Sequence, residues 1–434
     1  MAWPRGKGLG GSSLINAMIY LPGSLGDVRS LAERWNILPD ELAFHFPHRI
    51  QTALWHHAQS PEIHPLSHGF IETTCDSQSI APSDFLKAYH YTVGSFPKSI
   101  WHGRRLDAYQ AFVAIDAVAK RTRVYSDTLV DKIHFEQGRA VAVDCIREGK
   151  RRQFFAQRGV ILAAGSIASP LILQRSGIGP AIELEKHGIR VIHDLPAVGN
   201  NLQDHLLLPI IFGSNHDSLP RVPTLSETQQ YRWYGTGPWS SNIAEAGWFT
   251  NIDSKEIPQL QIHFTPTHYL EYPVRDQPMT AFTLGLTLLQ PKSRGRIALH
   301  SACPLEPPRI DPNYLSADED LRTLCDGVEL CRELACQSPL SGLKTSEMLP
   351  GNRRTKGFGL ERSIQAWCQT VFHPMGTCSI GDENCGVVDS NFKVHGVEGL
   401  YVVDASVFDR IPACNPAAQI MALASLAATR ISRL

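Results

Sequence analysis

The stretch GVILAAG, residues 159–165, is a short apolar run that ends in glycine. Such a run is typical of a buried strand in a parallel sheet whose carboxyl end delivers a loop. Residues 169 and 170, Ser-Pro, open a predicted helix, because proline is tolerated in the first helical turn. The sequence GIGP at 177–180 ends that helix. A strand that leads directly into a helix predicts an α/β domain around a parallel sheet.

The segments on either side of this stretch change their periodicity along the chain. Strands are expected at 124–125, 129–135, 140–146 and 400–404, and helices at 28–35, 84–91, 109–120, 318–335 and 417–431. Residues 259–264 and 296–299 alternate apolar and polar side chains as half-exposed strands do, and 280–289 is a longer apolar run. The middle of the chain therefore predicts a mainly antiparallel sheet.

Composition excludes several classes of protein. The 434 residues carry 41 Lys and Arg against 42 Asp and Glu, so a strongly basic nucleic-acid binder is excluded. No apolar stretch reaches about 20 residues, so no transmembrane helix is expected. The ten cysteines form no CxxC pair and are expected to be mostly buried free thiols. No cluster has metal-ligand spacing, and no GxSxG motif is found.

The beginning of the chain is a glycine-rich, polar loop. The sequence RGKGLGGSS at 5–13 passes into the apolar LINAMIY at 14–20. This pattern predicts a tight loop that enters a helix, with Ser12 or Ser13 as its cap. The free backbone N–H groups of such a loop suit a phosphate or another anion, and a plain capped turn is the alternative.

Five segments together resemble the glucose–methanol–choline (GMC) flavin oxidoreductases. They are GLGGSSLIN at 8–16, GSIASPLILQRSGIG at 165–179, VGNNLQDH at 198–205, HPMGTC at 373–378 and GLYVVDAS at 399–406. Residues 291–295 and 311–315 are similar to parts of the substrate domain of that family. The resemblance implies an α/β fold, α+β overall. A Rossmann-like FAD-binding domain would comprise residues 1–60, 100–205 and 365–434, with an inserted, mainly antiparallel substrate domain at 61–99 and 206–364.

The chain departs from the family pattern in one respect. Family members usually carry a GxGxxG fingerprint in a βαβ unit ahead of the first signature, and no such unit precedes the first signature in this sequence. The stretch GKGLGG at 6–11 has the same glycine spacing, but it overlaps the first signature itself. That unit normally places a helix N-terminus on the FAD pyrophosphate. The resemblance therefore implies an incomplete Rossmann-like domain whose central sheet exposes an edge. Either the chain is truncated or its FAD binding is weakened.

The resemblance assigns the chemistry to two residues. It implies transfer of a hydride from an alcohol carbon to flavin N5 while a base takes the hydroxyl proton. His373 matches the catalytic histidine of the family, and histidine suits a base with an ordinary pKa of about 6.5. Asn415 stands where members carry His or Asn. Asparagine can hold the substrate oxygen but cannot exchange protons, which leaves His373 as the only titrating member of the pair.

The resemblance also implies a set of FAD contacts. These are Gly11, Ser12, Ser13, Asn16, Val130, Ala164, Gly165, Asp404, Ala405, Asn415 and Pro416. Asp404 as a helix or turn cap and Val130 as a plain strand residue are the alternatives. Ile15 occupies the place of a histidine that bonds the flavin in some members, so non-covalent FAD is expected. His102, His205 and the pair His56–His57 are interpreted as ordinary surface or core residues.

Three functions follow from these residues. The first is FAD-dependent oxidation of an alcohol group in a small organic molecule, in specialised metabolism, with an unknown electron acceptor. The second is a non-redox cyclase or lyase that uses the histidine as base alone, and the third is a truncated, inactive chain. No nucleic acid, metal or transmembrane segment is expected. The first residues lack the apolar core of a signal peptide, and localisation stays open between cytoplasmic and secreted.

Overall fold

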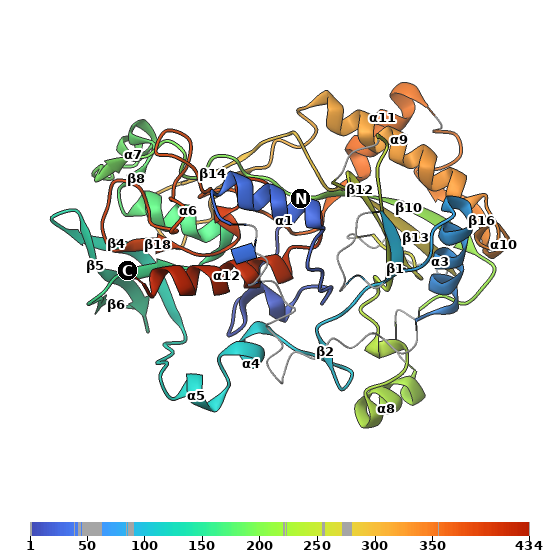
Figure 1. Cartoon of the computed structure of the whole chain (residues 1–434), viewed down its shortest axis with the longest axis horizontal. Coiled ribbons are helices and arrows are strands. Elements are labelled where there is room, and N and C mark those ends of the chain that lie inside the picture. Colours follow the sequence, from blue (N-terminus) through green and yellow to red (C-terminus); the bar gives the residue numbers. More distant parts are fainter. Residues whose placement is uncertain are drawn as a thin grey trace.

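The computed structural model describes residues 2–38, 40–41, 45, 63–83, 85, 91–219, 222, 224–253, 257–270, 280–354 and 356–433. Figure 1 shows a large sheet with helices at one end of the molecule. Smaller sheets and the C-terminal helix α12 (Ala417–Ile431) occupy the other end. Helix α1 (Leu25–Arg34) lies between these two ends, beside the N-terminus (Figure 1).

The large sheet has seven strands, and all of its pairings are antiparallel. Its order is β1-β11-β12-β13-β10-β16, with β17 also paired to β10. The strands are β1 (Thr92–Ser95), β10 (Leu206–Ser214), β11 (Ala246–Thr250), β12 (Leu260–Thr265), β13 (Ala281–Leu288), β16 (Lys344–Leu349) and β17 (Gln369–Thr370). The predicted mainly antiparallel sheet is confirmed.

One face of this sheet forms an apolar core with helices. Leu260, Ile262 and Phe264 of β12 belong to a buried cluster with side chains of α3 (Pro65–Gln78) and α9 (Asp318–Ala335). The ring of Phe264 stacks on Phe70 of α3, with centroids 4.8 Å apart. Helix α9 has the bounds that the apolar spacing predicts.

The opposite face of β12 is polar and buried as well. Gln261, His263 and Thr265 alternate with the apolar residues, and all six residues of the strand are buried. The prediction of a half-exposed strand at 259–264 is therefore wrong. The polar face packs against the segment around Asn415, to which Gln261 donates a hydrogen bond of 3.1 Å. Alternation here marks an internal polar surface and not solvent.

The predicted parallel strand is confirmed. Strand β7 (Val160–Leu162) pairs in parallel with β18 (Leu400–Val402), and the chain then enters helix α6 (Gly165–Arg175). Within the described residues this sheet has only these two strands. Ile161, in the middle of β7, is 53% exposed, while the neighbouring Leu162 is 5% exposed. One face of this strand is therefore exposed and the other is buried, and the expected open edge of the central sheet stays a prediction.

Helix α6 begins four residues before the predicted start, so Pro170 lies inside it. A proline in a helix interior leaves the carbonyl four residues earlier without its N–H donor. Here that carbonyl belongs to Ser166, and it accepts a hydrogen bond of 2.6 Å from Thr377 Oγ1. A side chain distant in sequence therefore satisfies the acceptor that the proline leaves unpaired, which local periodicity cannot reveal.

Some of the other local predictions are wrong and others are confirmed. The helix expected at 109–120 is two short helices, α4 (Ala108–Phe112) and α5 (Asp116–Ala119). Residues 124–125 form no strand, and the loop at 5–13 leads only into a 3-10 turn, η1 (Gly11–Leu14), because Gly10 before it is left-handed. The prediction at 84–91 lies mostly outside the described residues. Helices α1 and α12 confirm the predictions at 28–35 and 417–431.

The remaining elements are short or peripheral. Strands β4 (Thr128–Glu136), β5 (Arg139–Arg147) and β6 (Lys150–Phe155) form an antiparallel sheet that confirms the strands at 129–135 and 140–146. The others are β2 (Ile100–Trp101), β3 (Arg104–Arg105), β8 (Ile178–Gly179), β9 (His193–Asp194), β14 (Arg296–Ala298), β15 (Arg309–Asp311), α7 (Ala181–Lys186), α8 (Leu225–Tyr234), α10 (Leu340–Leu343), α11 (Gly357–Trp367), η2 (Pro238–Ser240) and η3 (Ala405–Val407).

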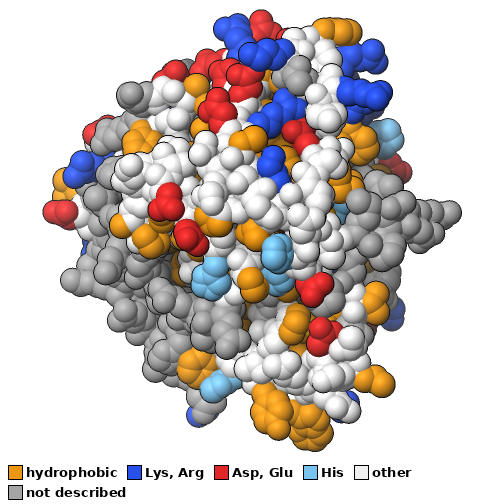
Figure 2. All heavy atoms as spheres, turned by 90° about the vertical axis from the view of Figure 1, so that its right-hand side faces the viewer, with side chains coloured by type: hydrophobic (Ala, Val, Ile, Leu, Met, Phe, Trp, Pro, Cys, Tyr) orange, Lys and Arg blue, Asp and Glu red, His pale blue; other side chains and the backbone are white. Residues whose placement is uncertain are grey.

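The surface carries charges of both signs. In Figure 2, Lys and Arg side chains lie beside Asp and Glu side chains at the upper end, and large hydrophobic side chains gather at the lower end. Trp233 and Tyr234 of α8 are 75% and 78% exposed. None of the ten cysteines forms a disulfide in the described structure, and four are buried, three are half-buried and three are exposed, so the expectation of mostly buried thiols is wrong. Among the described helices none is long and apolar enough to cross a membrane.

Candidate active site

His373 lies just after β17, at a turn that is fixed by its neighbours. The preceding residue, Phe372, has a left-handed backbone with φ 65°, and its N–H donates to Thr370 Oγ1 at 2.8 Å. The backbone N–H of His373 donates to Asp204 Oδ1 at 2.8 Å. The position of the predicted base is therefore set by backbone contacts as well as by its own ring.

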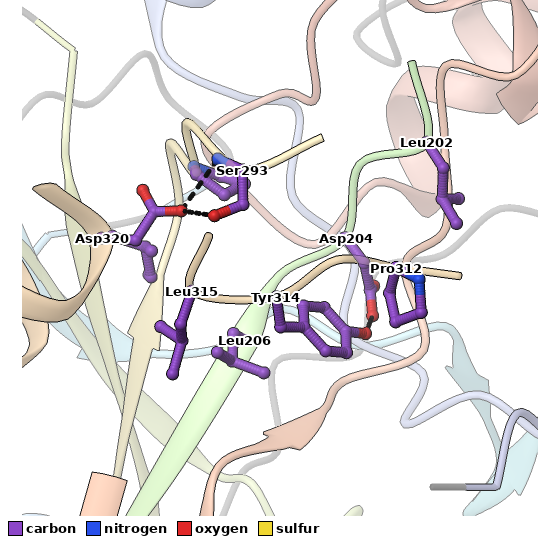
Figure 3. A pocket seen from close by; sticks show the side chains of 10 residues that line it. Leu202, Asp204, Leu206, Ser293, Pro312, Tyr314, Leu315 and Asp320 are labelled. Atoms are coloured by element: carbon purple, nitrogen blue, oxygen red, sulfur yellow. Dashed lines mark hydrogen bonds between the residues drawn. The ribbon is translucent and has the colours of Figure 1, made fainter. Parts of the chain in front are cut away.

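Asp204 is the anchor of this turn. It is buried, and its second oxygen accepts hydrogen bonds from the Thr370 and Tyr314 hydroxyl groups. Figure 3 shows the Tyr314 ring directed toward Asp204 at the side of a small recess. Burial raises the pKa of Asp204 to about 6, and the hydrogen bonds from Thr370, Tyr314 and His373 oppose that rise. Three donors satisfy a carboxyl group that burial alone would destabilise.

The ring of His373 contacts His205, the residue that follows Asp204. The Nδ1 atoms of the two rings are 3.0 Å apart, and the rings meet edge to face with centroids 5.2 Å apart. The other ring nitrogen of His205, Nε2, lies 3.1 Å from the carbonyl oxygen of Leu289. From the sequence, His205 was interpreted as an ordinary surface or core residue. Its place in the segment 198–205, directly after the anchor Asp204, is the signal that was available.

Asn415 precedes the first turn of α12 and is buried. Its side-chain Oδ1 accepts the hydrogen bond from Gln261 Nε2, which leaves the amide NH₂ group to donate to another oxygen. His263, two residues after Gln261 on the same face of β12, interacts with the Asn415 side chain and electrostatically with His373. The structure therefore brings both predicted catalytic residues into one cluster, to which β12 adds two polar residues that the sequence analysis did not assign.

Burial keeps the histidines of this cluster neutral. It lowers the pKa of His205 to about 3 and that of His263 to about 4. Burial also lowers the pKa of His373 well below its ordinary value, and the electrostatic effects of His205, His263 and Arg5 lower it further. At neutral pH, His373 is therefore a neutral imidazole with one N–H group and one bare nitrogen, which is the form that can accept a proton.

The predicted cofactor residues near the N-terminus form a compact loop. Ser13 Oγ donates to Gly10 O at 2.5 Å and accepts from Ala108 N at 2.9 Å. Asn16 Oδ1 accepts from Arg105 Nη1 at 2.6 Å, and Ser12 Oγ accepts from Gly6 N at 3.2 Å. The loop is thus held by its own polar side chains.

A second group of predicted cofactor residues surrounds the start of α6. Asp404 accepts from Gly165 N at 2.8 Å, from Ser169 Oγ at 2.6 Å and from Ser406 N at 2.8 Å. These contacts cap α6 and η3, as the alternative interpretation of Asp404 anticipated, and a contact to the cofactor stays a prediction. Ala164 is the N-cap of α6, and Ala405 accepts from Gly376 N at 3.3 Å.

Val130 and Pro416 lie in regular elements. Val130 is half-buried on β4, opposite Cys145 of β5, and Pro416 is the N-cap residue of α12. His102 packs against Trp101 with ring centroids 4.5 Å apart, and His56 and His57 lie outside the described residues. In the described part of the chain, no group of His, Cys, Asp or Glu could hold a metal ion.

The surroundings of two glycines fit a dinucleotide. A Cβ atom added to Gly11 or to Gly165 would meet nothing within 4 Å, so open space adjoins both residues. The Ser166 hydroxyl at the start of α6 is buried and has no hydrogen-bond partner in the described structure. Open space at a helix N-terminus, an unpaired hydroxyl and a carboxylate suit a group that carries both phosphates and hydroxyls. The residues present therefore fit FAD.

Comparison with known proteins identifies the class. The family model for the N-terminal domain of GMC oxidoreductases matches residues 1–207, and the model for the C-terminal domain matches residues 291–424. An alcohol dehydrogenase [acceptor] of Pseudomonas putida is 32% identical over 456 aligned positions, which cover 99% of this chain and 82% of the relative. An oxygen-dependent choline dehydrogenase of Chromohalobacter salexigens is 33% identical, with 98% and 80% covered.

Solved structures share the fold. A formate oxidase of Aspergillus oryzae matches with a TM-score of 0.89 at 23% identity, over 99% of this chain and 84% of the other. The pyridoxine 4-oxidase of Mesorbium loti matches with a TM-score of 0.86 at 24% identity, over 100% and 85%. The chain belongs to the GMC oxidoreductase family. It is an FAD-dependent oxidoreductase that acts on CH–OH donors.

Proposed function

We propose that the chain oxidises the alcohol group of a small organic molecule, with His373 as the base and Asn415 as the donor that holds the alcohol oxygen. The observation that carries this proposal is the hydrogen bonding of the two side chains, which leaves one of them able to accept a proton and the other able to donate a hydrogen bond. His373 is neutral and, among the described residues, is hydrogen-bonded through one ring nitrogen, and Asn415 has its oxygen occupied by Gln261. The free ring nitrogen can accept a proton, and the free amide NH₂ can donate a hydrogen bond.

The two residues divide the work of the reaction. Oxidation of an alcohol to a carbonyl breaks the O–H bond and the C–H bond on the same centre. His373 accepts the hydroxyl proton, and the electron pair of the O–H bond becomes part of the new C=O bond. Asn415 stabilises the negative charge that develops on the oxygen as the proton leaves. Bound FAD supplies the acceptor for the hydride that leaves the carbon.

FAD would be held without a covalent bond. Gly11, Ser12, Ser13 and Asn16 would line one side of the cofactor, and Gly165 with Asp404 the other. The support for non-covalent binding is Ile15, whose side chain cannot form a bond to the flavin and is 54% exposed beside the glycine-rich loop. The division into an FAD-binding and a substrate-binding domain is proposed with the boundaries given from the sequence, supported by two separate apolar cores.

The substrate class rests on similarity and on the buried polar surface of β12. Relatives named for alcohol and choline oxidation support a small alcohol as the substrate. We propose an alcohol of specialised metabolism in preference to a sugar. The support for that choice is the resemblance of the C-terminal segment.

The test is anaerobic reduction of the flavin. The protein is loaded with FAD and desalted, and a panel of small alcohols is added while the absorbance of the oxidised flavin is followed. We expect the absorbance to fall with a reactive alcohol. In His373→Gln the rate of this decrease in absorbance should be lower by roughly 10²–10⁴-fold, because proton transfer to a general base contributes a rate factor of about that size. His300→Gln, at an exposed position, serves as the matched control and reacts like the parent.

Three results would contradict the proposal or a part of it. Conversion of a compound without any loss of oxidised-flavin absorbance would show a non-redox reaction. An unchanged rate in His373→Gln, with FAD still bound, would remove this residue from the role of base. Loss of all visible absorbance on desalting would show that this chain does not hold FAD, and the test would then contradict the proposed cofactor.

A further inference from the structure

The contact between His205 and His373 raises the question of which nitrogen carries a proton. A neutral imidazole has one N–H donor and one bare acceptor nitrogen. The two Nδ1 atoms are 3.0 Å apart, so one of them must donate and the other must accept. Two bare nitrogens, or two N–H groups, would repel each other at this distance.

The carbonyl of Leu289 resolves the question. A backbone carbonyl oxygen is only an acceptor, and Leu289 O lies 3.1 Å from His205 Nε2. His205 must therefore carry its proton on Nε2, because the opposite tautomer would place a bare nitrogen against the carbonyl oxygen in a buried site. His205 is 1% exposed, so no bulk water relieves such a mismatch.

The tautomer of His205 determines that of His373. With its proton on Nε2, His205 presents a bare Nδ1 as acceptor. His373 then donates from Nδ1, and its Nε2 is left without a proton. We propose that His205 is a positioning residue which, through the Leu289 carbonyl, holds His373 in the tautomer whose Nε2 is the free base. This inference deepens the proposed function and rests on His373 being the base.

The arrangement also suits the protonated state. When His373 accepts a proton on Nε2, its Nδ1–H is retained, so the hydrogen bond to His205 does not have to reverse. A hydrogen bond from a charged donor is stronger than a neutral one. The groups that face the pair are His263, Arg5 and Asp204. His263 and Arg5 disfavour positive charge on His373, which promotes release of the proton after the reaction.

Two consecutive residues, Asp204 and His205, thus hold the backbone and the ring of His373. Asp204 accepts the backbone N–H of His373, and His205 accepts its ring N–H. Asp204 is itself held by Tyr314, as Figure 3 shows, and by Thr370. The backbone anchor sets where the ring lies, and the ring anchor sets which nitrogen faces the reacting proton.

A matched pair of variants separates this role from packing. In His205→Asn the amide oxygen falls near the position of Nδ1 and can still accept from His373, while the contact to Leu289 is lost. In His205→Gln the amide nitrogen falls near the position of Nε2 and keeps Leu289, while the acceptor for His373 is lost. We expect kcat within about three-fold of the parent for His205→Asn and a loss of at least about ten-fold for His205→Gln, a part of the general-base contribution. A role in packing alone would affect both variants alike, and that result would overturn the proposal.

The direct test does not depend on turnover. The FAD-loaded protein is prepared with ¹⁵N-labelled histidine, and the ring nitrogens are assigned by comparison with His373→Gln and His205→Asn. We expect the signals of His373 to show a protonated Nδ1 and an unprotonated Nε2 at neutral pH, and those of His205 to show a protonated Nε2. A protonated Nε2 on neutral His373 would overturn the inference.

The two readouts also distinguish this inference from the proposed function. The expected NMR pattern without any alcohol oxidation would contradict the function and leave the tautomer assignment standing. Oxidation that needs His373, together with the opposite tautomer, would leave the function standing and contradict the role of His205.

Discussion

The seven-stranded sheet and the parallel pair β7–β18 differ in how completely they are covered. Every residue of β10, β12 and β13 is buried, on both faces of the large sheet. In β7, Leu162 is 5% exposed and its neighbour Ile161 is 53% exposed. Parallel strands are normally buried on both faces. The pair β7–β18 is thus covered on one side only within the described structure.

The difference separates the surroundings of the proposed catalytic residues from those of the proposed cofactor residues. His263 and Gln261 lie on the fully buried sheet, and Gln261 orients Asn415 from there. Several of the residues expected to hold FAD, such as Gly165 and Asp404, lie instead just after β7 and β18, where a two-stranded sheet supports them. We therefore expect substitutions in the large sheet to change the stability of the fold, and substitutions in the loops that follow β7 and β18 to change cofactor affinity.

The largest expected effect is in the core of the large sheet. Phe264→Ala removes a ring that stacks on Phe70 and Phe282, and we expect a loss of about 3–5 kcal/mol in the free energy of unfolding. Urea unfolding followed by fluorescence measures this loss. Phe358→Ala, at a 72% exposed position, is the control, with a change within about 0.5 kcal/mol. Similar losses in the two variants would contradict the contrast between a closed core and an open surface.

The next effect is the pH dependence that His263 gives to the same sheet. Its pKa is about 4 in the folded protein and about 6.5 when unfolded, so the unfolded chain binds more protons between these values. The stability that His263 contributes is therefore present above pH 6.5 and is lost as the pH falls toward 4. Relative to His263→Gln, the parent should lose about 2 kcal/mol between pH 7 and pH 5.

Comparison of the two proteins separates this effect from that of the buried carboxyl groups. Asp27 and Asp204 have pKa values raised to about 6 by burial, and their contribution has the opposite sign. It is present in both proteins and cancels in the difference. Urea unfolding at the two pH values provides the measurement. A difference that does not change with pH would mean that His263 is not held neutral on the inner face of the sheet.

The sequence predicted elements well where local patterns decide them. The spacing of apolar residues predicted α9 with its observed bounds, and a short apolar run ending in glycine predicted the parallel strand β7. The helix expected at 109–120 failed because residues 113–115 interrupt it, although its apolar residues keep helical spacing. The start of α6 was placed too late because the partner that makes Pro170 acceptable, Thr377, is 207 residues further along the chain.

The site, like the fold, was predictable where local sequence motifs decide it and not where contacts between distant residues decide it. His373 and Asn415 were found through a resemblance of motifs, and the structure brings them into one cluster. His205 was missed because a lone histidine carries no signal of what its ring contacts, and here the contact spans 168 residues. The alternation of β12 was recognised, but its polar face was interpreted as facing solvent. Only tertiary structure shows that Asn415 covers this face.

A third prediction concerns the cofactor side of the comparison. Gly165 has φ 83° with open space beside it, and Gly138, in the β4–β5 turn, has φ 78° with the same open space. Alanine at either position incurs a similar backbone strain of about 1–2 kcal/mol. We expect Gly165→Ala to weaken FAD binding at least about ten-fold, roughly 1.4 kcal/mol, and Gly138→Ala to leave it unchanged. Titration of the desalted proteins with FAD, followed by fluorescence, measures both. Equal affinities would show that Gly165 does not face the cofactor.

The smallest expected effect is at the open face of β7. Ile161→Ala should change the free energy of unfolding by no more than about 0.5 kcal/mol, because the side chain is half exposed and loses little buried area. Leu162→Ala, one residue further along the same strand but directed into the core, should cost about 2–5 kcal/mol. Urea unfolding of the two variants measures the difference across one strand. If Ile161→Ala cost as much as Leu162→Ala, a further surface would have to cover this face in solution. The parallel pair would then be as closed as the large sheet, and the comparison between the two regions would no longer hold.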